Sequence, residues 1–410
     1  MRSTRVFWTV ISFCGFHGLM MMEWLPHDVV ELILERLPVK SLLRFKSVSK
    51  QWKSTMESRS FQERQSKKQS GGDPDVLMAS ASADESLRTL ALGSSSSVKI
   101  PTPWDKEGNT TEYLVSNNSC DGLVCLYHPL GSESGFVVNP ATRWYRPLPL
   151  CQFQQLVISQ GESYFETQHG IFKLGFGKDM IGTTTYKPVW LYNSLEIGLD
   201  NATRCEVFDF ISNAWRYVTP SAPYRVVGAA DPVFVHGSLH WFTACVDTKI
   251  LSFDLHTEAF QIISKAPFPA NSHDNPYAIV LCNLDNRLCV SQMQYSDRVI
   301  WSFNSGNKTW DKIFSIDLVM TTVLYDCPTL CAFHPLAVLD GMKNKRKKKK
   351  KKKVKEVKER MVKKNLLFYD RVKSQYLLIH DPETDLDDFT FTAESSMGFL
   401  VCYFQSLISI

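Results

Sequence analysis

The stretch Leu25–Trp52, LPHDVVELILERLPVKSLLRFKSVSKQW, decides how the first part of this chain folds. Its first half spaces apolar residues as one face of an α-helix does. The residues of this stripe are Val29, Leu32, Ile33 and Leu37. Asp28 can cap the start of such a helix, and Pro38 cannot continue it. We therefore predict a helix that begins near Asp28 and ends before Pro38.

Two more helices are expected in this stretch and just beyond it. One passes through Leu42 and Leu43, and the other begins at Ser49 and carries Trp52. Serine is a favoured first cap, because its side chain accepts a hydrogen bond from a free backbone N–H of the helix. Residues 23–64 are thus predicted to form a small three-helix domain.

Polar residues follow, and the pattern then changes. Residues 65–74, QSKKQSGGDP, are rich in helix breakers and are predicted to be a linker. From residue 75 to residue 410, short apolar runs alternate with turn residues, which is typical of an all-β domain. The predicted fold class is α+β, with a small N-terminal three-helix domain followed by a mainly-β domain.

The β domain contains a loose repeat of an apolar strand, a turn with Asn or Asp, and an aromatic residue. The units are residues 136–149, 205–218, 250–263, 299–313 and 366–379. Their aromatic residues are Trp144, Trp215, Phe260, Trp310 and Tyr376. The intervals scatter around the ~40–50 residues of a propeller blade. We predict an irregular β-propeller in which each aromatic packs between neighbouring blades, and unrelated hairpins in a sandwich are the alternative.

A lysine-rich run, residues 343–364, interrupts this domain as an insertion. Its 15 Lys or Arg residues and two Glu give it a net charge of +13, which leaves −9 for the rest of a chain whose total is +4. The acidic remainder excludes a broad phosphate-binding surface. Three interpretations of the run remain open: a nuclear localisation signal, a non-specific nucleic-acid contact, or a self-repelling loop without a role. We expect no specific nucleic-acid partner.

The first 22 residues and the cysteines point to different compartments. Val6–Met22 is almost entirely apolar and follows Arg2 and Arg5, as in a signal peptide or a short membrane anchor. It is shorter than the ~20 residues of a comfortable membrane span, and Met20–Met22 suggests a later translation start or a gene-model artefact. The 11 cysteines lack a disulfide framework, which indicates a protein of the cytoplasm or nucleus. No membrane contact is expected unless residues 1–22 are expressed.

Motifs for metal binding are incomplete. His236 and His240 are four residues apart, but Gly237-Ser238 predicts a hairpin turn where a zinc site of this spacing needs a helix. A second group lacks a fourth ligand and consists of Cys327, Cys331 and His334. We expect no metal and no cofactor.

Motifs for catalysis are missing as well. The nucleophile-elbow pattern fails at Gly131–Gly135, since its central residue is Glu133, and no phosphate-binding glycine loop occurs. Gly175 and Gly177 are a lone glycine pair, which we predict to mark a bulge or a turn. We expect no catalytic residue and no enzymatic activity.

Many residues between 24 and 64 stand in one known pattern. They are Leu25-Pro26, Leu32, Ile33, Leu37-Pro38, Val39-Lys40-Ser41-Leu42, Arg44, Val48-Ser49-Lys50, Trp52 and Phe61. This pattern resembles the F-box motif. The resemblance implies binding to a Skp-type adaptor, which connects an F-box to the cullin and RING subunits of a ubiquitin ligase.

Physical reasoning agrees with a partner surface on this domain. A unit of ~40 residues cannot bury all of its apolar side chains within its own core. The expected adaptor-binding residues are Leu25, Pro26, Leu32, Ile33, Leu37, Pro38, Leu42, Leu43, Val48 and Trp52. A small helical cap packed on the β domain is the alternative.

The β domain has a set of signatures of its own. They are SCDGLVCL at 119–126, VNPATR at 138–143, LGFG at 174–177, HGSLHW at 236–241, ILSFD at 250–254 and YFQSL at 403–407. These resemble the F-box-associated domain of plant proteins, which usually has Glu where Gln405 stands. The resemblance implies a substrate receptor of an SCF-type ubiquitin ligase, whose β domain holds an unknown target protein.

Two other functions remain open. One is a glycan- or ligand-binding propeller that does not serve a ligase. The other is a secreted or membrane-anchored propeller, which four N-x-S/T sequons would suit. The sequons are at Asn109, Asn117, Asn201 and Asn307.

Overall fold

The computed structural model describes most of the chain, with gaps. The described residues are 25–79, 87–102, 113–128, 134–160, 172–181, 185–268, 278–294, 297–319, 333–340, 364–370, 375–382, 384, 386–392 and 397–410. The apolar stretch before Met22 and the lysine-rich run up to residue 363 lie outside them, as do Cys327 and Cys331.

The N-terminal part forms a helical module, residues 25–69. Its helices are α3 (His27–Leu34), α4 (Val39–Phe45), α5 (Lys50–Glu57) and α6 (Arg59–Gln69). Four helices therefore stand where three were predicted, and residues 65–69 of the predicted linker are helical. The reason is local, because the Ser58 side chain accepts the backbone N–H of Phe61 and starts a new helix directly after α5.

The ends of the first helix also differ in detail from the prediction. Pro26, and not Asp28, is the residue before the first turn of α3, and Asp28 lies inside that turn. An acidic residue there still favours the positive end of the helix dipole. The helix ends at Leu34, and a turn leads to Pro38, which precedes α4.

The rest of the described chain is a six-bladed β-propeller, as predicted, and not a sandwich. Each blade is a four-stranded antiparallel sheet. One blade joins β24 (Phe399–Tyr403) to β1 (Asp75–Ala79), β2 (Leu87–Leu90) and β3 (Val98–Lys99). The second holds β4 (Leu114–Cys120), β5 (Leu123–Tyr127), β6 (Phe136–Asn139) and β7 (Trp144–Pro147). The third holds β8 (Gly175–Lys178), β9 (Tyr186–Asn193), β10 (Thr203–Asp209) and β11 (Ala214–Tyr217).

The other three blades complete the ring. The fourth holds β12 (Val233–Val235), β13 (Ser238–Phe242), β14 (Lys249–Asp254) and β15 (Phe260–Lys265). The fifth holds β16 (Ile279–Leu284), β17 (Arg287–Gln294), β18 (Asp297–Asn304) and β19 (Thr309–Asp317). The sixth holds β20 (Phe333–Asp340), β21 (Lys364–Asp370), β22 (Tyr376–Asp381) and β23 (Leu386–Thr392). Two short helices, α7 (Gln152–Gln160) and η1 (Ser194–Ile197), lie in connections. The ring closes where β24 pairs with β1, so strands from both ends of the domain share one sheet.

Four of the five predicted repeat units match the outer hairpins of their blades. The fifth, residues 366–379, falls instead on β21 and β22, the second and third strands. Its aromatic, Tyr376, is therefore not equivalent to the others, and the prediction was wrong in phase there. The cause is that a strand–turn–aromatic pattern fits any hairpin and does not distinguish inner from outer strands.

Two of the predicted aromatic anchors do connect neighbouring blades. The indole Nε1 of Trp215 on β11 donates to the carbonyl of Pro149, 2.6 Å away, just beyond β7. The indole Nε1 of Trp310 on β19 donates to the carbonyl of Lys265 on β15 at 2.9 Å. Each ring also packs on an aromatic of its own blade, such as Phe303 beside Trp310. These anchors fix the angle between adjacent blades.

Gly175 and Gly177 mark neither a bulge nor a turn, so that prediction was wrong. Both lie within β8, which pairs regularly with β9. A Cβ on Gly177 would stand 2.5 Å from Leu255 Cδ1 and 2.7 Å from Phe234 Cδ2 of the next blade. The glycines are therefore explained by close packing between blades.

The two ends of the ring differ. Because neighbouring strands in a blade are antiparallel, the turns between first and second strands all lie at one end, which we call the turn end. Three of them have only two residues, all with positive φ: Asp121-Gly122, His236-Gly237 and Asp285-Asn286. The other end, the loop end, carries the connections between blades, such as residues 218–232. The lysine-rich run is inserted between β20 and β21, at the turn end.

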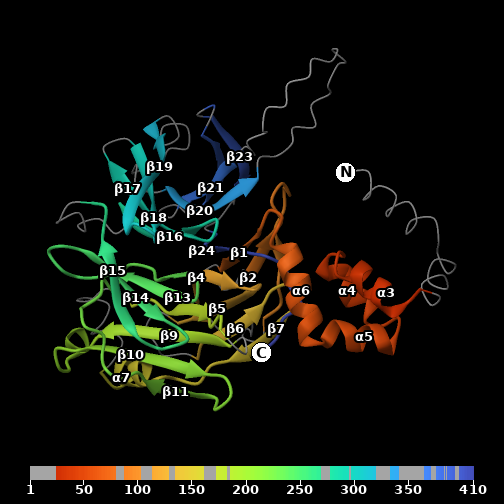
Figure 1. The fold of residues 1–410 in the computed structure, drawn as a ribbon, viewed down its shortest axis with the longest axis horizontal. Helices are drawn as coiled ribbons and strands as arrows, with labels where there is room; N and C mark the ends of the chain where they lie inside the picture. The colour runs from red at the N-terminus through yellow and green to blue at the C-terminus, as the bar shows by residue number, and fades with distance from the viewer. Residues whose placement is uncertain are drawn as a thin grey trace.

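The helical module also stands at the turn end. It enters the ring through Asp75, the first residue of β1, which pairs with Tyr403, the last residue of β24. Figure 1 shows the four helices grouped to one side of the ring, beside the C-terminus. Ala141, in the β6–β7 turn, packs against the core of the module. In the described part of the chain, no helix is long and apolar enough to cross a membrane.

Candidate adaptor-binding surface

Helix α3 is apolar on two faces. One face is buried, and it carries Val30 and Leu34. The other is open to solvent and carries Val29 and Leu32, which keep 37% and 48% of their surface exposed and, three residues apart, lie on the same side of the helix. Leu25, which is 40% exposed, lies just before the helix. We call Leu25, Val29 and Leu32 the apolar stripe.

The buried face belongs to a core that is already filled. Its members from the helices are Val30, Leu34, Val39, Leu42, Trp52, Met56 and Phe61. Phe45 packs edge-on against Trp52 with ring centroids 5.8 Å apart. Because this core is occupied, the apolar stripe has no partner within the module, and large exposed apolar side chains in a group mark an interaction surface.

The predicted adaptor-binding residues divide into three groups. The exposed ones are Leu25, Pro26, Leu32, Pro38 and Val48. The partly buried ones are Ile33, Leu37 and Leu43. Leu42 and Trp52, which are 0% and 8% exposed, belong to the core and present no surface. Val29, which the predicted set does not contain, is exposed beside Leu32.

An ionic cluster holds α3 against α6. The carboxylate of Glu35, buried just beyond α3, accepts Arg64 Nε at 2.6 Å and is also paired with Lys68. Arg64 reaches Glu31 as well. Burial alone would raise the pKa of Glu35, but the hydrogen bonds from Lys68 and Arg64 outweigh it and hold this pKa below its ordinary value. The cluster fixes the direction in which the apolar stripe points.

Comparison with known families matches both parts of this architecture. The F-box domain model matches residues 22–64, and the model of the F-box associated beta propeller domain matches residues 76–410. The chain belongs to the F-box proteins with an F-box-associated β-propeller. The helical module is the F-box, and the resemblance seen in the sequence is confirmed.

Relatives in Arabidopsis thaliana cover nearly the whole chain. The F-box/LRR-repeat/kelch-repeat protein At1g09650 is 59% identical over 398 residues, which are 95% of this chain and 98% of the relative. The F-box protein At5g10340 is 48% identical over 95% of this chain and 85% of its own length. Among solved structures, TolB from Acinetobacter baumannii covers 84% of this chain and 72% of its own with a TM-score of 0.40 and 7% identity, a likeness too low to add to the assignment.

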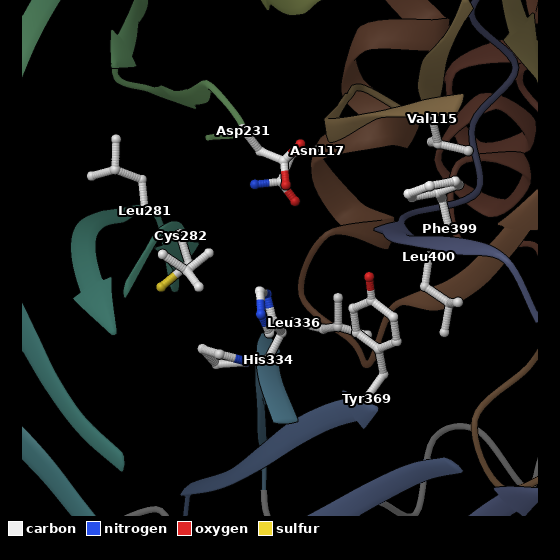
Figure 2. A pocket seen from close by; sticks show the side chains of 12 residues that line it. Val115, Asn117, Asp231, Leu281, Cys282, His334, Leu336, Tyr369, Phe399 and Leu400 are labelled. Carbon is white, nitrogen blue, oxygen red and sulfur yellow. The ribbon is translucent and has the colours of Figure 1, made fainter. Parts of the chain in front are cut away.

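The propeller has a small opening at its centre, on the loop end. Figure 2 shows Asn117, Asp231, His334 and Tyr369 around it, among apolar side chains of the inner strands. The cavity measures about 30 Å³, which is room for one or two water molecules. A ligand of the size of a sugar therefore does not fit inside it, and a partner at this end would contact the surrounding loops.

The histidines and cysteines of the described residues do not assemble a metal site. No group of three or more His, Cys, Asp or Glu side chains comes close enough to hold a metal ion there. His236 occupies the tight turn before β13, and His240 is buried in that strand. The buried cysteines are Cys120, Cys125, Cys151, Cys205, Cys282 and Cys289. Burial raises the pKa of these thiols, that of Cys289 to about 11, so they are poor nucleophiles at neutral pH.

Proposed function

We propose that this chain is the substrate receptor of an SCF-type ubiquitin ligase, and that its F-box binds a Skp-type adaptor through the apolar stripe of α3. The observation that carries the proposal is that the stripe is exposed beside a core that is already filled. Leucine and valine side chains in such a position gain free energy only when a partner covers them. Val48, which is 42% exposed in the α4–α5 connection, extends the same kind of surface.

The adaptor would link the chain to the cullin and RING subunits, which supply the ubiquitin-transfer chemistry. The chain itself acts without catalysis in this proposal. The raised pKa values of its buried thiols support that role, since ubiquitin transfer through a cysteine needs an accessible thiolate. Free buried cysteines also suit a reducing compartment, and we place the protein in the cytoplasm, the nucleus or both.

We place the target on the loop end of the propeller. The F-box covers part of the turn end, and three of the turns there have only two residues and offer little surface. The connections between blades, at the opposite end, are longer, and surface loops on a rigid scaffold are the usual carriers of specificity. A target held there would stand on the far side of the ring from the F-box.

The test is binding of the full chain to a purified Skp-type adaptor, measured by titration calorimetry. Leu32→Asp places a charge on the most exposed side chain of the apolar stripe without touching the core, and we expect it to weaken binding at least ~100-fold, because the charge would be buried unpaired in the interface. Ile211→Asp is the matched control, since Ile211 is 88% exposed in a propeller turn. Equal affinity of the Leu32→Asp variant and the native chain would exclude the stripe as the adaptor site.

The same titration separates the alternatives. A glycan- or ligand-binding propeller outside a ligase would not bind the adaptor at all. A secreted or anchored protein would carry glycans at its sequons when expressed in its natural tissue, which mass measurement of the intact protein detects.

A further inference from the structure

The core of the F-box is completed by a residue from the other end of the described chain. Leu407, in the segment 404–410 that follows β24, is only 3% exposed and packs among the F-box core residues, which include Leu42 and Trp52. The next residue, Ile408, is equally buried but points into the propeller, in the core between the second and third blades. Consecutive side chains of one short segment therefore enter two different cores.

A buried asparagine holds this segment in place. Asn139, the last residue of β6, donates from Nδ2 to the carbonyls of Ser406 at 3.1 Å and Ile408 at 2.8 Å. Its Oδ1 accepts the backbone N–H of Ala141 at 3.0 Å. Both functions of the amide are thus satisfied inside the protein, where an unsatisfied amide would be costly. The bonds fix which side of the segment faces the F-box.

The approach of the segment to the second blade also needs a glycine. Gly122, in the β4–β5 turn, has a φ of +80°, and a Cβ there would stand 2.5 Å from the carbonyl oxygen of Phe404. The side chain of Gln405 donates to the carboxylate of Asp75 at 2.6 Å, where the chain passes from the F-box into β1. The segment therefore contacts the second blade, the F-box and the connection between the F-box and the ring.

The same stretch of chain closes the ring. Val401 of β24 pairs with Leu77 of β1, and the segment with Leu407 begins directly after this strand. If β24 is not paired with β1, Leu407 is not delivered to the F-box. Leu407 lies only six positions after Val401, so ring closure and completion of the F-box core are physically linked.

We propose that segment 404–410 couples closure of the propeller to completion of the F-box, so that the F-box core is complete only while β24 is paired with β1. A helical module of this size has a small core, so the loss of one buried leucine removes a large part of the module's free energy of unfolding. The coupling holds the apolar stripe and the loop end in a fixed relative orientation. The coupling also restricts adaptor binding to chains whose propeller has closed, a consequence that rests on the proposed function.

Hydrogen exchange of the full chain, without any adaptor, tests the coupling. In the Leu407→Ala variant we expect the amides of α5 and α6 to exchange roughly 30-fold faster or more, as the free energy of a buried leucine truncation implies. Ser409→Ala is the matched control, because Ser409 is exposed two residues further along the same segment. Strands β16–β18, on the far side of the ring, should keep their native protection and show that the variant is folded.

Three outcomes decide the matter. Faster exchange of α5 and α6 in Leu407→Ala but not in Ser409→Ala supports the coupling, and Leu407→Val should give the same effect at smaller size if the alanine variant does not fold. Native exchange rates of α5 and α6 in either Leu407 variant would overturn it. Since no adaptor is present, this failure is distinct from failure of the proposed function, which the Leu32→Asp titration reports.

Discussion

Leu42 and Leu32 offer the sharpest contrast that the structure predicts within the F-box. Both were expected to bind the adaptor, yet Leu42 is fully buried in the module and Leu32 is 48% exposed. Truncation of each to alanine removes the same atoms, from the core of the module at Leu42 and from its surface at Leu32. The pair therefore separates a stabilising role from a binding role.

The magnitudes follow from burial. Truncation of a buried leucine costs about 2–5 kcal/mol, and full burial puts Leu42→Ala at about 3–5 kcal/mol. Leu32→Ala gives up a side chain that is already half in water, so its cost to folding is expected to stay under about 1 kcal/mol. Its cost to adaptor binding is expected to be about 1–2 kcal/mol, a roughly tenfold loss of affinity.

Urea unfolding, followed by the fluorescence of Trp52, measures the first quantity, with the other tryptophans replaced by phenylalanine where they tolerate it. Calorimetric titration with the adaptor below the unfolding range measures the second. Leu42→Ala should lower the free energy of unfolding, whereas Leu32→Ala should lower the affinity for the adaptor. Equal loss of stability in the two variants would refute the division of α3 and α4 into a core side and a partner side.

Three further outcomes are expected. Burial lowers the pKa of His240 to about 4, below the ordinary 6.5, so the unfolded chain binds a proton that the folded chain rejects. The free energy of unfolding should therefore fall by about 3 kcal/mol as the pH drops from 6.5 to 4, and His240→Gln should remove this part of the pH dependence; an unchanged pH dependence in that variant would contradict the role of His240. Gly177→Ala, which forces a methyl group against the next blade, should cost about 1–3 kcal/mol and lower the melting temperature, whereas Gly306→Ala in an exposed turn should not; equal melting temperatures would contradict the packing role of β8. Trp310→Phe keeps an aromatic side chain, although a smaller one, but loses the indole donor to β15. Differential scanning calorimetry should show a loss of at least about 1 kcal/mol, and an undiminished stability would be the contrary result.

Much of the architecture could be predicted because it depends on local patterns. Helical spacing in Leu25–Trp52 predicted the first three helices, and alternating apolar runs with turn residues predicted blades and hairpins. The start of α6 was missed although its signal was present: Ser58 is a serine cap three residues before the buried Phe61. Residues 65–69 are polar and were therefore predicted to be a linker. The helix that contains them is held in place by ion pairs with Glu31 and Glu35.

The candidate site was predicted less well, for a physical reason. Periodicity shows that α3 is apolar but not which of its faces turns inward, since Leu32 and Leu34 are alike in composition. Burial of Leu42 and exposure of Leu32 depend on where α5 and α6 pack, and the core residues Trp52 and Phe61 of those helices lie 10 and 19 positions after Leu42. The F-box pattern names positions that matter without separating the positions that fold the module from those that bind a partner.

By itself, the sequence determined that the first part is helical and the second mainly β, the order of the two parts and the family to which the chain belongs. These depend on neighbours within a few residues, or on a pattern that is read position by position. Only the tertiary structure decided which leucines face outward, how the fifth repeat is phased, and that Leu407 belongs to the F-box core. The contacts of Leu407 join residues more than 300 positions apart, and no local propensity or period contains the information about which distant side chain fills a given space.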